Sequence, residues 1–276
     1  CRAAEAKYNI LVVPVKAPGF SGTKSQGYKL ACDAIMKVIM PAFDGSKIPG
    51  SINILGDYNL SGEMWIMQGY FKKLGIKVNA TITGDASLET LQTASKSVLN
   101  IVQCAGSSTY LAKRMEAEWG IPFIKVSFFG IEDTSNSLLR VAEALGDEAV
   151  IKKAEAMTKI ESAKLQGFLA KYKPKLAGKK AAIYVGGGFK AISLIRQFNE
   201  LGIETVVVGT QTGQKEEYDI IRQLSSPGTI IMDDANPSEL ETFMKEKKAD
   251  ILVGGVKERP LAYKLGVAFC DHNHER

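Results

Sequence analysis

Cysteine, glycine and lysine residues recur at positions where predicted strands end. Cys104 follows the apolar run 100–103 and precedes a helical pattern, and other apolar runs lead into glycine-rich turns that carry lysines. These turns are residues 18–24, 186–190 and 254–259. A helix N-terminus favours a thiolate, and lysines stabilise a nearby anion. The sequence therefore predicts a site for a compact anion that is held partly by sulfur.

Each of these features also has a purely structural explanation. A lone cysteine after a buried strand, such as Cys104, is often a small core side chain. The glycines at 186–188 also suit a tight turn, and single lysines are ordinarily solvated. His272 and His274 are spaced for a metal pair, although histidines at a chain end are ordinarily solvated. The exposure of Cys104 decides between the two explanations.

The elements that position these residues alternate between strands and helices. The predicted strands are 10–15, 52–55, 77–82, 100–103, 122–126, 181–185, 204–208, 229–232 and 250–253. Several are apolar throughout, as expected for parallel strands that are covered on both faces. Gly75, Gly120 and Gly202 end amphipathic segments and suit left-handed helix caps. The alternation predicts an α/β fold of tandem Rossmann-like, doubly wound parallel sheets.

The length of 276 residues corresponds to roughly two domains of about 150 residues. We expect Rossmann-like domains over 51–146 and 179–276, joined by a helical connector over 147–178. Residues 1–50 hold one predicted strand and one helix, which predicts the remnant of an N-terminal α/β domain. Because the chain begins at Cys1 and not at Met, we expect it to be a fragment.

The composition excludes several classes of protein. Apolar residues make up 45% and charged residues 24%, which excludes a disordered or collagen-like chain. The net charge of +5 contains no long run of like charges, so nucleic acid is not an expected partner. The longest apolar run, 10–15, is far shorter than the roughly 20 residues that span a bilayer, so no membrane is expected. Four cysteines without C-x-x-C spacing predict a reducing, cytoplasmic location.

The second glycine turn has an alternative use in nucleotide binding. Gly186, Gly188 and Ala191 match the pattern G-x-G-x-x-A between a strand and a helix. The pattern also requires an acidic residue at the end of the next strand to hold the ribose, and 206–210 contains none. A metal-free nucleotide-binding domain is therefore one alternative function.

Ordered motifs along nearly the whole chain resemble those of the nitrogenase component 1 family. They are Pro18-Gly19-Phe20-x-Gly22, Gly56-Asp57-Tyr58-Asn59-Leu60-x-Gly62-Glu63, Gly120-Ile121-Pro122-Phe123, Phe128-Phe129-Gly130-Ile131, Tyr184-Val185-Gly186-Gly187 and Gly254-Gly255-Val256-Lys257-Glu258. Members of this family are α and β subunits whose Rossmann-like domains enclose a metal–sulfur cluster. The resemblance implies that Cys104 ligates an iron–sulfur cluster and that Ser107 supports its thiolate.

The resemblance also assigns residues around the cluster. Lys24, Lys190 and Lys257 would neutralise its negative charge. Gly186 and Gly187 would let the backbone approach it closely.

Three positions depart from the catalytic α subunits of the family. Asn273 stands where those subunits have a histidine ligand to molybdenum, and Tyr28 and Lys24 replace a second histidine and a glutamine. An amide is a poorer ligand than imidazole, so one Cys–Fe bond and electrostatic attraction would hold the cluster. Such a cluster is released more easily. The resemblance therefore implies a scaffold for a precursor of the iron–molybdenum cofactor, without catalysis of its own.

The same resemblance implies partners for the full-length protein. They are a β-like scaffold subunit that completes a heterotetramer, a radical enzyme that donates clusters, and the nitrogenase reductase. The family's second cluster uses cysteines upstream of Cys1, which leaves open that the fragment alone is metal-free. The other alternative is a catalytic α-type subunit of a nitrogenase-like oxidoreductase, in which His272 or His274 points at the cluster.

Overall fold

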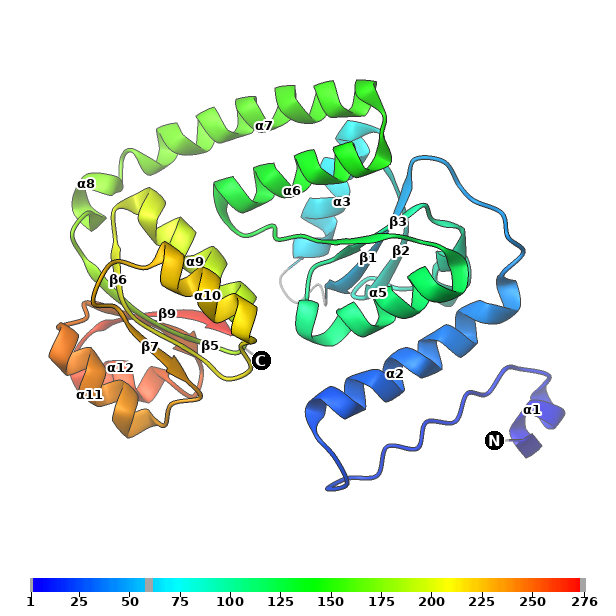
Figure 1. The fold of residues 1–276 in the computed structure, drawn as a ribbon, viewed down its shortest axis with the longest axis horizontal. Helices are drawn as coiled ribbons and strands as arrows, with labels where there is room; N and C mark the ends of the chain where they lie inside the picture. Colours follow the sequence, from blue (N-terminus) through cyan, green and yellow to red (C-terminus); the bar gives the residue numbers. More distant parts are fainter. Residues whose placement is uncertain (1, 58–61, 274–276) are drawn as a thin grey trace. The chain divides into compact units, whose positions relative to one another are not determined.

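The computed structural model describes residues 2–57 and 62–273, without the side chains of Arg2, Lys24 and Asn273. The chain divides into two compact units, each built on one parallel sheet (Figure 1). The first unit comprises residues 1–128 and 137–156, and the second comprises 129–136 and 157–276. None of the described helices has the length and apolar character needed to cross a membrane.

The first unit has a four-stranded parallel sheet in the order β2-β1-β3-β4. Its strands are β1 (Ser51–Asp57), β2 (Lys77–Thr83), β3 (Leu99–Val102) and β4 (Phe123–Lys125). Its helices are α1 (Arg2–Tyr8), α2 (Lys24–Ile39), η1 (Met40–Ala42), α3 (Glu63–Leu74), α4 (Leu88–Gln92), η2 (Ala94–Lys96) and α5 (Ala105–Trp119). Every residue of β1 and β3 is buried, as expected for inner strands covered on both faces.

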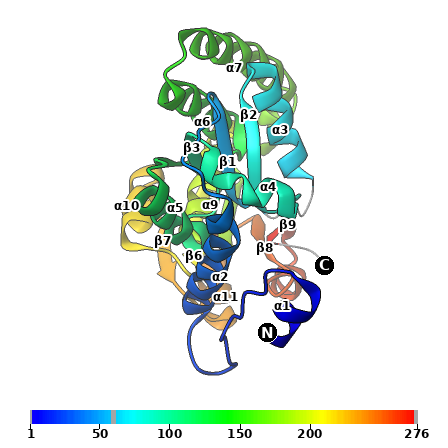
Figure 2. The ribbon, with the colours of Figure 1, turned by 90° about the vertical axis from the view of Figure 1, so that its right-hand side faces the viewer.

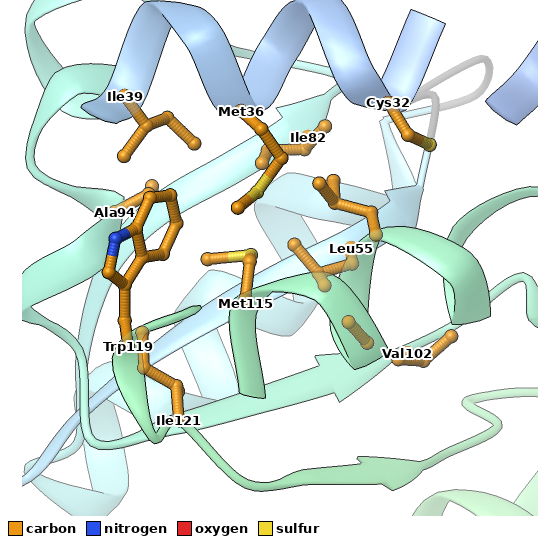
Figure 3. Close-up of a cluster of buried hydrophobic side chains, with 13 residues drawn as sticks. Cys32, Met36, Ile39, Leu55, Ile82, Ala94, Val102, Met115, Trp119 and Ile121 are labelled. Atoms are coloured by element: carbon orange, nitrogen blue, oxygen red, sulfur yellow. The ribbon is translucent and has the colours of Figure 1, made fainter. Parts of the chain in front are cut away.

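Helices α2 and α5 share one apolar core with this sheet (Figure 3). Met36 and Ile39 of α2 lie against Met115 and Trp119 of α5, and Leu55 of β1 closes the cluster. Met36 is 1% exposed and Met115 is fully buried. Helix α3 lies along β2 on the opposite face of the sheet (Figures 1 and 2). The packing of α2 therefore fixes α5, the helix that follows Cys104.

The second unit has a five-stranded parallel sheet in the order β7-β6-β5-β8-β9, a doubly wound arrangement. Its strands are β5 (Lys180–Val185), β6 (Glu204–Thr210), β7 (Ile230–Asp233), β8 (Ile251–Gly255) and β9 (Ala268–Asn273). Its helices are α8 (Lys173–Leu176), α9 (Gly188–Leu201), α10 (Lys215–Leu224), α11 (Pro237–Lys247) and α12 (Arg259–Leu265). Helices α6 (Gly130–Leu145) and α7 (Glu148–Leu169) contribute residues to both units.

Alternate residues of β5 serve two separate cores on the two faces of this sheet. Ala182 and Tyr184 pack in a cluster with α11 and α12. Ile183 and Val185 pack in a cluster with α9 and α10. Successive side chains of a strand point to opposite faces, so a strand covered on both faces is apolar without alternation. The predicted α/β class with parallel sheets is confirmed.

Eight of the nine predicted strands are present, and the prediction for 10–15 is wrong. Ile10, Leu11 and Val15 are 56%, 54% and 48% exposed, and no described strand pairs with the segment. A strand forms only when its backbone groups find a partner, so the apolar pattern alone was insufficient. Strand β9 was not predicted. The domain limits at residues 50, 146 and 178 stay predictions about the full-length protein.

Candidate functional site

Cys104 lies between β3 and α5, at the residue that caps the N-terminus of α5. Its side chain is partly exposed, whereas Cys32 is buried in the core of the first unit. Free N–H groups and the helix dipole make the start of a 15-residue helix favourable for an anion. The thiol of Cys104 is thus partly accessible and lies outside the apolar core of the first unit.

Gly56 of β1 forms the floor beneath this turn. Its φ is +83°, and a Cβ atom there would lie 2.7 Å from Ser108 Oγ, 2.9 Å from Cys104 Cβ and 3.0 Å from Cys104 N. No other residue type fits, because φ is left-handed and a backbone atom is among the contacts. Gly56 belongs to a family motif and is not among the predicted site residues. A glycine inside a buried strand was the available signal.

Ser107 is 6% exposed and supports the same turn. Its hydroxyl lies 3.5 Å from the Cys104 carbonyl oxygen and 3.2 Å from Ser108 Oγ. Its own carbonyl oxygen accepts a hydrogen bond from the Cys32 thiol, at 3.7 Å. These contacts reach the backbone of Cys104 and not its sulfur, so direct support of the thiolate stays a prediction.

A polar network joins α2 to α5. Asp33 Oδ1 accepts hydrogen bonds from the Tyr110 hydroxyl at 3.0 Å and from Arg114 Nη1 at 2.6 Å. Tyr28 is half-buried on α2, and Lys24 is the first residue of that helix. The side chain of Lys24 lies outside the described part of the chain. The network holds α2, which carries Tyr28, against α5, whose N-terminus Cys104 caps.

Lys190 lies beyond the carboxyl end of β5, in the first turn of α9. Its ammonium donates to the carbonyl oxygen of His272 at 2.8 Å and lies 5.8 Å from the ring centroid of Phe129. The His272 ring packs edge-on against the same phenylalanine, with centroids 5.7 Å apart. Lys190 therefore anchors the end of β9.

The turn after β8 meets the end of β9 at the same edge. Asn273 pairs with Gly255 in the strand register, and Arg259 forms an ion pair with Asp271 at 2.8 Å. Lys257 is exposed on this turn. The side chain of Asn273 and all of His274 lie outside the described residues. The second unit thus brings Lys190, Lys257 and the backbone of Asn273 to one edge.

The glycine turn after β5 borders this edge. A Cβ atom at Gly186 or Gly187 would meet no atom within 4 Å, and neither has a positive φ. Packing within the described chain therefore does not require glycine at either position. Gly188 differs, because a Cβ atom there would lie 2.7 Å from Glu217 Oε2.

The donor set for a metal is small. The described residues contain no group of three His, Cys, Asp or Glu side chains that could hold a metal ion. Cys104, Ser107 and Tyr28 belong to the first unit, whereas Gly186, Gly187, Lys190, Lys257 and Asn273 belong to the second. The thiol of Cys104 is the one predicted metal ligand among these described residues.

Tyr184 of β5 makes the free energy of unfolding depend on pH. Burial, together with the nearby charge of Asp234, raises the pKa of Tyr184 to about 12. Its hydroxyl donates to the Ala235 carbonyl oxygen at 2.7 Å. We expect Tyr184→Phe to lower the free energy of unfolding at pH 8 by about 1 kcal/mol.

Above pH 10 the unfolded tyrosine releases its proton while the folded one keeps it to about pH 12. The parent therefore loses stability between pH 10 and pH 12, and Tyr184→Phe should lose less over that range. Urea unfolding at pH 8 and near pH 11 measures both effects. Equal slopes against pH for the two proteins would contradict the assignment to Tyr184.

Comparison with known proteins places this geometry in a family. The family model of nitrogenase component 1 type oxidoreductases matches residues 1–276. The nitrogenase iron-molybdenum cofactor biosynthesis protein NifE of Clostridium pasteurianum is 61% identical over all of this chain and 60% of its own length. The protein of the same name from Methanosarcina barkeri is 48% identical over all of this chain and 62% of its own length.

The solved structure of nitrogenase Cp1 at pH 6.5 has the same fold. Its TM-score is 0.86 at 28% identity, over 98% of this chain and 62% of that chain. This chain thus spans about three fifths of the length of the proteins it matches. The match over every residue shows that the chain belongs to the nitrogenase component 1 type oxidoreductase family.

Proposed function

We propose that the full-length protein is a scaffold subunit that binds an iron–sulfur precursor during biosynthesis of the nitrogenase iron–molybdenum cofactor. The partly exposed thiol of Cys104, held at the start of α5 above Gly56, carries this proposal. The relatives at 61% and 48% identity, which are named for cofactor biosynthesis, support it.

The donor set suits cargo that must leave again. One Cys–Fe bond from Cys104 would hold the precursor, and the ammonium groups of Lys190 and Lys257 would offset its negative charge without a covalent bond. Gly186 and Gly187 would leave room for it, because a side chain is absent at both positions. Lys24, Tyr28 and Asn273 complete the proposed surroundings, and Ser107 supports the turn.

The proposal extends to partners. A β-like scaffold subunit would complete a heterotetramer with the full-length protein in the cytoplasm. A radical enzyme would supply the precursor, and the nitrogenase reductase would act during its maturation. The family of multi-subunit proteins to which the chain belongs supports this arrangement.

The test is iron retention by the full-length heteromer after reconstitution with precursor cluster. Cys104→Ala should retain about tenfold less iron after gel filtration, since loss of even an outer contact weakens a metal site by that order. Cys270→Ser is the matched control, because Cys270 is an exposed cysteine of the second unit. Equal iron in Cys104→Ala and parent would refute the ligand assignment and the proposed function.

The two alternatives gain no support from the geometry. The carboxylate of Glu217, a residue of α10, lies beside Gly188 at the start of α9. A pyrophosphate bound there would meet this negative charge, which disfavours nucleotide binding. A catalytic subunit would direct His272 or His274 at the cluster. The His272 ring packs against Phe129, and His274 lies outside the described residues. Acetylene reduction by the purified complex would revive the catalytic alternative.

A further inference from the structure

The positive charge of the chain is concentrated in one segment of the second unit. Residues 162–180 contain six lysines and no acidic residue. The whole chain has 35 basic and 30 acidic residues, so the rest of the chain has 29 basic and 30 acidic residues. The net charge of +5 therefore arises from the end of α7, from α8 and from the first residue of β5.

The lysines of this segment are available for a partner. Lys171, Lys173 and Lys175 are exposed, and none of them has an ion pair within the described part of the chain. Lys164 and Lys179 each have one acidic neighbour, at 3.0 Å and 3.4 Å. The three lysines without an ion pair therefore carry charge that the described fold leaves uncompensated.

An apolar stripe runs along the same segment. Leu165, Phe168 and Tyr172 are 47%, 53% and 45% exposed. Leu165 and Phe168 lie three residues apart on α7, and Tyr172 follows in the turn before α8. The rings of Phe168 and Tyr172 pack together with centroids 5.1 Å apart. The α7–α8 surface is defined by Leu165, Phe168, Lys171, Tyr172, Lys173 and Lys175. It precedes the first residue of β5, whereas Lys190 follows the last residue of that strand.

We infer that the α7–α8 surface is a docking site for a partner protein with an acidic surface. Protein interfaces combine an aromatic centre with a polar rim, and this surface has an aromatic pair beside three lysines. The lysine rim complements acidic side chains and accelerates encounter. A membrane-surface helix needs one continuous apolar face, whereas here Tyr172 lies beyond the end of α7 at Leu169. Binding of a single-stranded nucleic acid needs aromatic ring faces on which bases stack, whereas these two rings contact each other.

The test uses the full-length protein with the triple change Lys171→Glu, Lys173→Glu and Lys175→Glu. Phe168→Ala is a second variant that leaves the charge unchanged. The matched control is Lys113→Glu, Lys152→Glu and Lys215→Glu, which alters the same number of exposed lysines elsewhere.

The protein probes rest on the proposed function and are the purified β-like scaffold subunit, the radical enzyme and the nitrogenase reductase. The other probes are phosphatidylglycerol vesicles and poly-uridine RNA. Affinities are measured at low and high salt.

We expect at least one protein partner to bind about tenfold more weakly to both the triple variant and Phe168→Ala, and not to the control. The loss should shrink at high salt for the triple variant. The inference is overturned if every protein affinity stays within about twofold of the parent, or if only vesicles or RNA respond. The iron content of the same variants is measured as well. Because it depends on Cys104 and not on the α7–α8 surface, it separates a failure of docking from a failure of the scaffold role.

Discussion

Gly56→Ala is expected to remove most of the cluster from the full-length heteromer although Cys104 is unchanged. The added Cβ atom would lie 2.9 Å from Cys104 Cβ, which is closer than real Cβ contacts, and 3.0 Å from Cys104 N, which is tighter than most of them. The backbone at φ +83° adds a strain of about 1–3 kcal/mol for any other residue. Since neither the strand end nor the helix start can move freely, the sulfur must shift.

Iron content and urea unfolding of the same preparation measure the two consequences. Gly69→Ala is the matched control, because it lies in α3 with no atom within 4 Å of the added Cβ and no positive φ. Alanine favours a helix by about 1 kcal/mol over glycine, so this control should keep both stability and iron. A folded Gly56→Ala protein with the iron content of the parent would contradict the role of this floor.

Most of the fold followed from local patterns in the sequence. Gly75, Gly120 and Gly202 end α3, α5 and α9 with φ of 81°, 63° and 74°, as the helical patterns predicted. The buried strand β5 was recognisable because residues 181–185 are apolar throughout, as in parallel strands covered on both faces. Strand β9 was missed because its second half, Asp271, His272 and Asn273, is polar.

The site was predictable only where the chain itself brings residues to a strand end. Cys104 follows β3 and Lys190 follows β5, so topology alone placed both at carboxyl edges. The hydrogen bond from Lys190 to the His272 carbonyl oxygen joins residues 82 positions apart. No local pattern contains such a contact. The same holds for Gly56, whose neighbours at Cys104 and Ser108 come from a different strand and helix.

Asp133 shows most clearly what the sequence could not reveal. An acidic residue in the first turn of a helix is ordinarily solvated, and it interacts there with the helix dipole. In the structure Asp133 of α6 is 4% exposed. It accepts hydrogen bonds from the Ser193 hydroxyl and the Arg196 guanidinium of α9. Glu132, the preceding residue, remains 56% exposed in its side chain.

Asp133→Ala is therefore expected to lower the free energy of unfolding by about 3 kcal/mol, because it strands a partly buried guanidinium and a buried hydroxyl. Arg196→Ala should also be costly, since it leaves a buried carboxylate without its cation. The double variant removes both charges, so its loss should be clearly smaller than the sum of the single losses. Urea unfolding of the four proteins measures this coupling.

Glu132→Ala is the matched control for this cycle. The exposed Glu132 carboxylate lies 3.9 Å from Arg196 Nε, and a solvated pair at that distance contributes at most about 0.5 kcal/mol. If Glu132→Ala and Asp133→Ala cost the same, or if the double variant is additive, burial of Asp133 is not the source of the stability. If the coupling appears, Asp133 anchors the helix that carries Lys190 and follows the Gly186–Gly187 turn. The arrangement of these residues within the second unit then depends on this carboxylate.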